Sequence, residues 1–224
     1  MAAKITTLID KQDNYEIVRD KVAQILADEV AAQKVLATAA AKDPDLWNFA
    51  VYTERSNPFI LARDGAGGIA GEKEIVNVWL DNSVFTDGDT VNRQQPTTTI
   101  NIDCVSVKSS TNNPAGGITL SADERASLDA ERIGRLVRNI LMSAVYTYLD
   151  LRGVVGSRWI SRMQKFQPDR EDQPVENATG YRVVLEVREN EFSPQEAGVD
   201  FEEVITEIRN DDGAVLASVT VDTT

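Results

Sequence analysis

Two long stretches of helical periodicity constrain the fold most, because each must lay an apolar stripe against something else. The first follows Asp13 and Glu16, which resemble a capping box, and continues to about Ala41. Pro44 ends it, since proline cannot continue a helix. Its apolar positions are Ile17, Val18, Val22, Ile25, Leu26 and an alanine-rich continuation through Leu36.

The second helical stretch begins at Ser121, where Ser121 and Glu124 have the spacing of a capping box. Its pattern predicts a helix to about Leu151, where Gly153 and Gly156 stop it. The apolar stripe comprises Leu128, Ile133, Leu136, Val137, Ile140, Leu141, Ala144, Val145, Tyr148 and Leu149.

The other regular segments have the patterns of strands. We predict strands over residues 45–54, 74–81, 97–108, 157–166 and 178–189. Within 97–108, apolar residues change from one face to the other between Cys104 and Val105, which indicates a bulge or burial on both faces. Residues 204–209 and 214–221 flank Asp212-Gly213 and predict a terminal hairpin. That hairpin is too polar to form much core alone, so we expect it to lie against its own sheet or a neighbour's.

This order of elements indicates an α+β fold, with two long helices packed on a mostly antiparallel sheet and a C-terminal β-hairpin. We divide the chain into an α+β domain over residues 1–192 and an extension over 193–224. The N-terminus has no apolar signal segment and no apolar run is long enough to span a membrane, so we expect a cytoplasm-like compartment.

Two polar loops could be interpreted as a phosphate-binding loop and a calcium-binding loop, but their residues favour neither interpretation. The loop 62–73 holds four glycines, but Gly71 is followed by Glu72 where a phosphate-binding loop needs lysine and a hydroxyl residue. The loop 82–96, with Asp81, Asp87 and Asp89 in and beside it, could hold calcium, but the spacing misses the EF-hand pattern. A solvated turn is the better interpretation. We therefore expect no metal and no cofactor.

The chain contains no histidine and one cysteine, Cys104, and this limits its chemistry. Catalytic triads built on histidine are excluded, and so are zinc sites that need histidine or several cysteines. Carboxylate chemistry remains as an alternative, with Asp81, Asp87, Asp89 and Asp103 as candidates. We place Asp103 at a solvent-facing strand position, where carboxylates are common, and expect no enzyme activity.

The chain carries a formal net charge of −13, which disfavours wholesale binding to DNA unless basic residues are gathered on one face. Such a face is predicted on the second helix, which carries Arg125 and the candidate inter-subunit contacts Arg132, Arg135 and Arg138. These arginines could meet an acidic neighbouring subunit, or they could form a solvated face with internal pairs such as Glu131 with Arg135. Further basic residues follow at Arg152, Arg158, Arg162 and Lys165.

The order of these segments resembles the tail terminator (tail-completion or neck) proteins of tailed bacteriophages. The resemblance covers residues 14–190 and rests on a first long helix, EIVNVWLD at 74–81, TTTINIDCVSVK at 97–108, a second helix ending in LMSAVYTYLD, and GYRVVLEVRE at 180–189. The extension 193–224 and the loop 62–73 are additional to the compact members.

The resemblance implies a structural virion protein, assembled in the host bacterial cytoplasm. It implies a hexameric ring that caps the head-proximal end of the tail tube, stops polymerisation and provides the docking surface for the head. The implied partners are other copies of the chain, the tail tube protein, the sheath protein of a contractile tail and a head-completion or connector protein, with DNA only as the passing genome. Another connector, stopper or neck subunit, or a tube or baseplate component, is the alternative.

Overall fold

The computed structural model describes residues 12–59, 73–85, 93–108, 120–167, 177–192, 203–209 and 215–222. Residues 11–191 form one compact unit, and the strands β8 and β9 belong to a second. The first unit is an α+β fold with two long helices and a five-stranded, mostly antiparallel sheet, as the sequence predicts. The two helices are α1 (Asn14–Ala39) and α3 (Ala122–Leu141).

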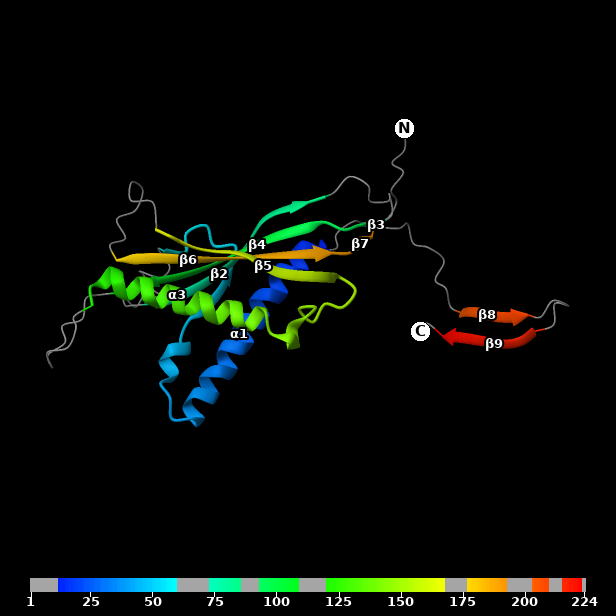
Figure 1. The fold of residues 1–224 in the computed structure, drawn as a ribbon, viewed down its shortest axis with the longest axis horizontal. Coiled ribbons are helices and arrows are strands. Elements are labelled where there is room, and N and C mark those ends of the chain that lie inside the picture. The colour runs from blue at the N-terminus through cyan, green and yellow to red at the C-terminus, as the bar shows by residue number, and fades with distance from the viewer. Residues whose placement is uncertain are drawn as a thin grey trace, which may run out of the picture. The chain divides into compact units, whose positions relative to one another are not determined.

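The sheet has the strand order β1-β2-β4-β6-β5, and only the β1–β2 pair is parallel. Its strands are β1 (Ala50–Thr53), β2 (Lys73–Val84), β4 (Thr97–Val107), β5 (Val155–Phe166) and β6 (Ala178–Glu189). Short strands β3 (Arg93–Gln94) and β7 (Glu191–Phe192) pair separately. Figure 1 shows both helices on one side of the sheet, with α3 running nearly along the strands and α1 obliquely across.

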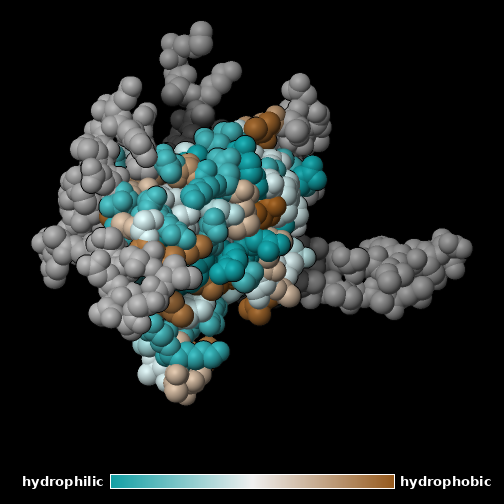
Figure 2. Space-filling model, turned by 60° about the vertical axis from the view of Figure 1, so that its left-hand side comes forward, coloured by the Kyte–Doolittle hydropathy of each residue, from teal (hydrophilic) through white to brown (hydrophobic). Residues whose placement is uncertain are grey.

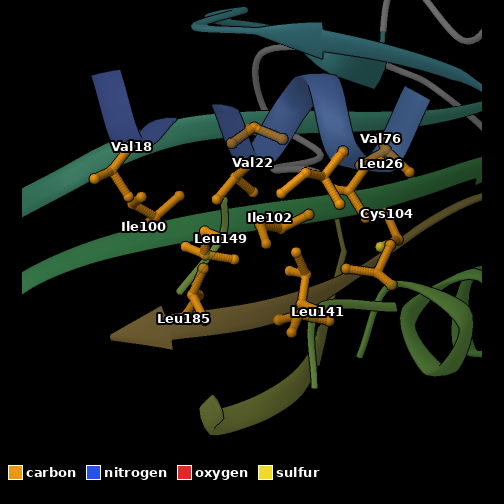
Figure 3. Packing of buried hydrophobic residues seen from close by; sticks show 14 of the residues in the cluster. Val18, Val22, Leu26, Val76, Ile100, Ile102, Cys104, Leu141, Leu149 and Leu185 are labelled. Carbon is orange, nitrogen blue, oxygen red and sulfur yellow. The ribbon is translucent and has the colours of Figure 1, made fainter. Parts of the chain in front are cut away.

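Both helices bury their apolar faces against the same face of the sheet, where α1 lies over β1 and β2 and α3 over β4 and β6. Figure 3 shows Val18, Val22 and Leu26 of α1 directed toward Ile100 and Ile102 of β4. The opposite face carries a smaller apolar cluster of Phe59, Ile75, Val105 and Ala178. The change of phase after Cys104 is therefore burial on both faces, because β4 pairs with β6 from Thr97 to Val107 without a bulge.

The N-terminus of α1 has the capping bond that the sequence predicts. The N-terminus of α3 lies at the predicted residue but lacks the predicted capping bond. The Asp13 N–H donates to Glu16 Oε2 at 3.0 Å, as a capping box requires. Ser121 is the N-cap of α3, but its side chain accepts no capping bond. Its hydroxyl bonds to the carboxylate of Asp123 instead, and this bond is the main reason that the pKa of Asp123 is lowered.

The predicted end of the second helix is wrong, because α3 stops at Leu141 and not near Leu151. A 3₁₀ helix, η2 (Ala144–Tyr146), follows, with Ser143 as its N-cap. Leu149 and Asp150 then take left-handed φ angles of 50° and 56° and turn the chain. This turn brings Leu149 into the core with none of its surface exposed, so burial of an apolar side chain prevails over helical periodicity.

The predicted strand 45–54 is also shorter than expected. Pro44–Trp47 forms a 3₁₀ helix, η1, and only Ala50–Thr53 is β1. The carboxylate of Asp43 accepts the Asp45 N–H at 3.0 Å, and Pro44 supplies a fixed φ at the first position of the turn. The capped 3₁₀ helix therefore occupies Pro44–Trp47, and the strand begins only at Ala50.

In the second unit, β8 (Glu203–Arg209) and β9 (Val215–Asp222) pair as an antiparallel two-stranded sheet. The predicted turn at Asp212-Gly213 lies outside the described residues. So do the loop 62–73, except Lys73, and the carboxylates Asp87 and Asp89.

Candidate interaction surfaces

The three arginines predicted as inter-subunit contacts divide into two kinds. Arg132 is held within the chain: its Nη2 lies 2.8 Å from Glu74 Oε2, its Nε lies 3.5 Å from Asp129, and its Nη1 donates to the Leu46 carbonyl. Arg135 and Arg138 are exposed. Within the described part of the chain neither of these two has an ion pair, and the predicted Glu131–Arg135 pair is not formed there.

Arg132 belongs to a network of four charges between α3 and the ends of β2 and β4. Lys108 Nζ lies 3.0 Å from Glu74 Oε1 and 3.1 Å from Asp129 Oδ2. The Glu74 side chain is only 8% exposed, so Lys108 and Arg132 offset the cost of its burial. The pKa of Lys108 is raised by Glu74 and Asp129 in spite of its burial, which lowers it. The network therefore fixes α3 to the sheet and leaves Arg132 unavailable to a neighbour.

The sheet face away from the helices carries a second polar cluster, around Asp103. Arg182 donates to both oxygens of this carboxylate, at 2.7 and 3.0 Å, and Trp79 Nε1 donates at 2.9 Å. The guanidinium of Arg182 also lies 5.0 Å from the ring centroids of Trp79 and Phe166. Asp103 is 4% exposed, so the prediction that it faces solvent is wrong. The alternation of the strand correctly places Asp103 on the sheet face opposite the helices, but the side chains of Trp79 and Arg182 cover it there.

A groove of about 400 Å³ lies where α1, α3, η1 and η2 meet. We call it the α1–α3 groove, and its lining residues are Glu29, Gln33, Trp47, Leu136, Asn139, Ile140, Ser143, Val145 and Tyr146. The Tyr146 hydroxyl donates to Glu29 Oε1 at 2.5 Å, and this bond raises the pKa of Tyr146 to about 12. Val145 is 78% exposed and Leu46, beside Trp47, is 45% exposed.

The groove is a candidate contact surface because its walls combine apolar side chains, such as Trp47 and Val145, with polar ones, such as Gln33 and Asn139. Sequence periodicity does not indicate the groove, because the helix that it predicts to about Leu151 includes Val145 and Tyr146, which lie in η2. Elsewhere the surface is mixed: the face in Figure 2 shows hydrophobic side chains in separate patches among hydrophilic ones.

The edge strand β5 is built to avoid pairing with another sheet. Its register shifts at Gly156 and again at Ser161, and shifts of this kind twist an edge away from a partner. Arg158, Arg162 and Lys165 add charges along the strand. Arg158 lies inward, donating to the carbonyls of Tyr146 and Ser143 at 2.6 and 2.8 Å.

The candidate carboxylates are not gathered into a site by the described structure. Asp81 lies exposed where the β2 register shifts, and Asp103 is occupied by Arg182 and Trp79. Within the residues described, no group of three or more acidic or cysteine side chains has the arrangement of a metal site. Cys104 is fully buried, and this burial raises the pKa of its thiol well above the usual value. None of the described helices is both long and apolar enough to cross a membrane.

No known protein family matches the chain, and no curated protein sequence matches it. Among solved structures, the chain is similar to one in the virion of a native gene transfer agent particle, with a TM-score of 0.38 and 16% identity. The alignment covers 66% of this chain and 83% of that one.

Proposed function

We propose that this protein is a structural component of a phage-like virion, a tail terminator that forms a ring at the head-proximal end of the tail tube. One observation carries the proposal: the segments that resemble tail terminators lie together in one α+β unit. In that unit α1 and α3 cover one face of an antiparallel sheet built from β2, β4 and β6. The ring would stop tail polymerisation and present a surface to the head.

A ring subunit of this kind acts by binding, so its functional groups are surfaces. The surfaces available for such contacts are the α1–α3 groove and the exposed Arg135 and Arg138. In an acidic chain of net charge −13, two arginines without an ion pair in the described structure suit an acidic neighbour. We propose other copies of the chain, the tail tube protein, a head-completion protein and, in a contractile tail, the sheath protein as partners.

We further propose that the protein is not an enzyme. Asp103, the candidate carboxylate that lies in a polar cluster, accepts three hydrogen bonds and has little exposed surface. Three lone-pair positions of this carboxylate are occupied and Trp79 and Arg182 cover it, which disfavours a role as a general base. The cluster is better explained as a link between β2, β4 and β6.

Contact with DNA is proposed only for the passing genome. The excess of 36 acidic over 23 basic residues makes the average surface repulsive to phosphates. Binding measured against salt concentration tests this, because phosphate contacts give a steep log–log slope and their absence a flat one.

The test is deletion of the gene in a particle-producing host, followed by electron microscopy. A terminator should leave overlong tail tubes without heads, and the wild-type gene should restore tails of uniform length. Tails of normal length beside headless or leaking capsids would indicate a connector or stopper instead. A subunit found as a monomer within intact particles would contradict both assignments.

Localisation within the particle gives an independent test. We expect six copies in a ring between the last tube ring and the neck in averaged images of purified particles. Density for the subunit at the baseplate, or along the whole tube, would overturn the terminator assignment and favour the alternative component.

A further inference from the structure

The exposed side of α3 carries a line of side chains in which opposite charges are separated. The members of the line recur at alternating intervals of four and three residues, which is the spacing of neighbours along one side of a helix. We call this line the α3 stripe, and its exposed members are Glu124, Leu128, Glu131, Arg135, Arg138 and Met142. Both glutamates precede both arginines. A stripe of this kind is complementary to itself when a second copy runs in the opposite direction.

Contacts within the chain do not account for the middle of the stripe. Glu131 and Arg135 have a spacing that suits an ion pair on one helix, but neither they nor Arg138 form an ion pair within the described residues. The helix dipole favours acidic residues in the first turn and basic residues in the last, which accounts for Glu124 and Arg138. This effect is confined to the end turns, so it leaves Glu131 and Arg135 unexplained.

An antiparallel second copy of α3 would supply the missing partners. When a two-fold axis passes beside Ile133, residues at equal distances on either side of this position face each other across the contact. Glu131 then faces Arg135 of the second copy, and the two-fold axis repeats this pair with the copies exchanged. Leu128 faces Arg138 of the second copy, whose aliphatic stem covers apolar surface while its charge stays in water.

The charges also select this register over the neighbouring ones. Two helices that pack along such a line change register in steps of seven residues. A step toward the C-terminus sets Arg135 opposite Arg138 of the second copy, and these like charges repel. A step toward the N-terminus sets Glu131 opposite Leu128 and leaves the glutamate without a cation. The register centred beside Ile133 avoids both losses.

We propose that two copies of this chain associate through their α3 stripes, antiparallel and related by a two-fold axis near the middle of α3. The chain carries a net charge of −13, and the acidic neighbour that Arg135 fits is Glu131 of the second copy. A two-fold contact uses the same patch on both copies and closes with two of them. The inference therefore goes beyond the proposed ring and does not depend on it.

Charge reversal tests the pairing. Glu131→Arg alone and Arg135→Glu alone each set like charges opposite each other twice, so each should raise the dimer dissociation constant at least about tenfold in sedimentation equilibrium. The double variant E131R/R135E restores opposite charges and should dimerise as the wild type does. An equimolar mixture of the two single variants should also dimerise, because one copy then presents two arginines and the other two glutamates.

The matched control for these variants is Arg162→Glu, which reverses an exposed charge on β5, outside the stripe. It should leave the dissociation constant unchanged. All of the variants should keep the melting temperature of the wild type, because surface substitutions cost little stability. A change in association without a change in melting temperature therefore reports on the contact and not on folding.

Disulfide trapping tests the direction and register of the helices. A preparation with Leu128→Cys is mixed with one that carries Arg138→Cys, so both copies keep Glu131 and Arg135, and the native Cys104 is fully buried. Mild oxidation should give a mixed covalent dimer. Leu128→Cys alone should give none, because two copies of this residue lie about 15 Å apart along the antiparallel helices and a disulfide needs Cα atoms within about 7 Å. Val84→Cys, 55% exposed on β2, replaces Leu128→Cys as the control and should not be trapped.

Several results would overturn the inference. They are a wild-type protein that sediments as a monomer throughout, single variants that dimerise as the wild type does, and a double reversal that fails to restore dimers. Covalent dimers of Leu128→Cys with itself would mean parallel helices, and equal trapping by Val84→Cys would mean random collision. None of these results bears on the terminator assignment, which is decided by whether a ring is present in the particle. A particle without that ring would refute the function and leave the dimer intact.

Discussion

Asp103 and Arg182 form a charge pair whose energy depends on how little water reaches it. The side chain of Asp103 is 6% exposed and that of Arg182 is 25% exposed. Breaking a buried pair costs about 3–5 kcal/mol, and access of water to one partner reduces this. We predict that Asp103→Asn lowers the free energy of unfolding by about 2 kcal/mol in urea titrations, because Arg182 keeps its charge between two rings and loses the carboxylate to which it donates.

Asp81→Asn is the matched control for Asp103. It removes an exposed carboxylate that acts on Arg182 only through space and not through a hydrogen bond, so the free energy of unfolding should change by less than about 0.5 kcal/mol. If both substitutions changed the free energy of unfolding equally, Asp103 would contribute only through the net charge of the protein and not through its hydrogen bonds. A gain of stability in Asp103→Asn would mean that the pair costs more in desolvation than it returns.

The hydrogen bond between Tyr146 and Glu29 predicts how the stability of the fold depends on pH. Its pKa of about 12 lies above the ordinary value of 10.0 because its hydroxyl donates to Glu29. The bond therefore stabilises the fold fully below about pH 10, and this contribution is lost as pH rises through about 12. In an ultraviolet titration, Glu29→Gln should lower the pKa of Tyr146, and Tyr146→Phe should remove the step near pH 12. Unchanged titration in Glu29→Gln would contradict the assignment.

At the scale of elements, Gly134 sets how closely α3 approaches β6. A Cβ at this position would lie 2.5 Å from Cδ1 of Tyr181, and contacts below 3.0 Å force something to move. Gly134→Ala gains about 1 kcal/mol of helix propensity, but overpacking costs about 1–3 kcal/mol. We predict a lower melting temperature for Gly134→Ala. Asn139→Ala, exposed on the same helix, should leave that temperature equal or higher. A rise in both would mean that the Tyr181 ring moves away freely.

The junction between α3 and η2 depends on Arg158. The guanidinium donates to the Ser143 and Tyr146 carbonyls, which also accept the backbone N–H groups of Tyr146 and Leu149, so Arg158 ties β5 to the turn that follows α3. We predict that Arg158→Ala costs about 1–3 kcal/mol and speeds amide exchange over residues 142–151. Arg162→Ala, an exposed arginine of the same strand, should change neither. Equal exchange in both variants would show that η2 is held by other contacts.

This junction also shows what could be predicted from the sequence. Periodicity located α1, β4 and β6 within about two residues, because apolar alternation along one element reports its own buried face. It could not end α3 at Leu141, since the signals there are a distant arginine and the burial of Leu149. Likewise, nothing local to Asp103 indicates that Arg182, 79 residues later, will cover it.

At the scale of the whole molecule, the charges of α3 serve two separate purposes. Arg132 joins Glu74 and Asp129 and stabilises one subunit, whereas Arg135 and Arg138 remain exposed on the same helix. Sequence spacing gives all three the same appearance. Only the position of β2 beneath the helix distinguishes the arginine that holds the fold from those that are free to meet a neighbour.

We therefore predict opposite effects for these arginines. Arg132→Ala should lower the melting temperature, because Glu74 would keep its buried charge with Lys108 as its remaining partner. The double variant Arg135→Glu and Arg138→Glu should melt as the wild type does, since surface changes cost little. It should nevertheless lose self-association in sedimentation, because the reversed charges would repel an acidic neighbour. The wild-type contact should weaken with added salt, whose screening length is about 10 Å at 0.1 M. If the double variant assembles normally, the neighbour is held by apolar contacts alone, and the arginines of α3 have no part in the ring.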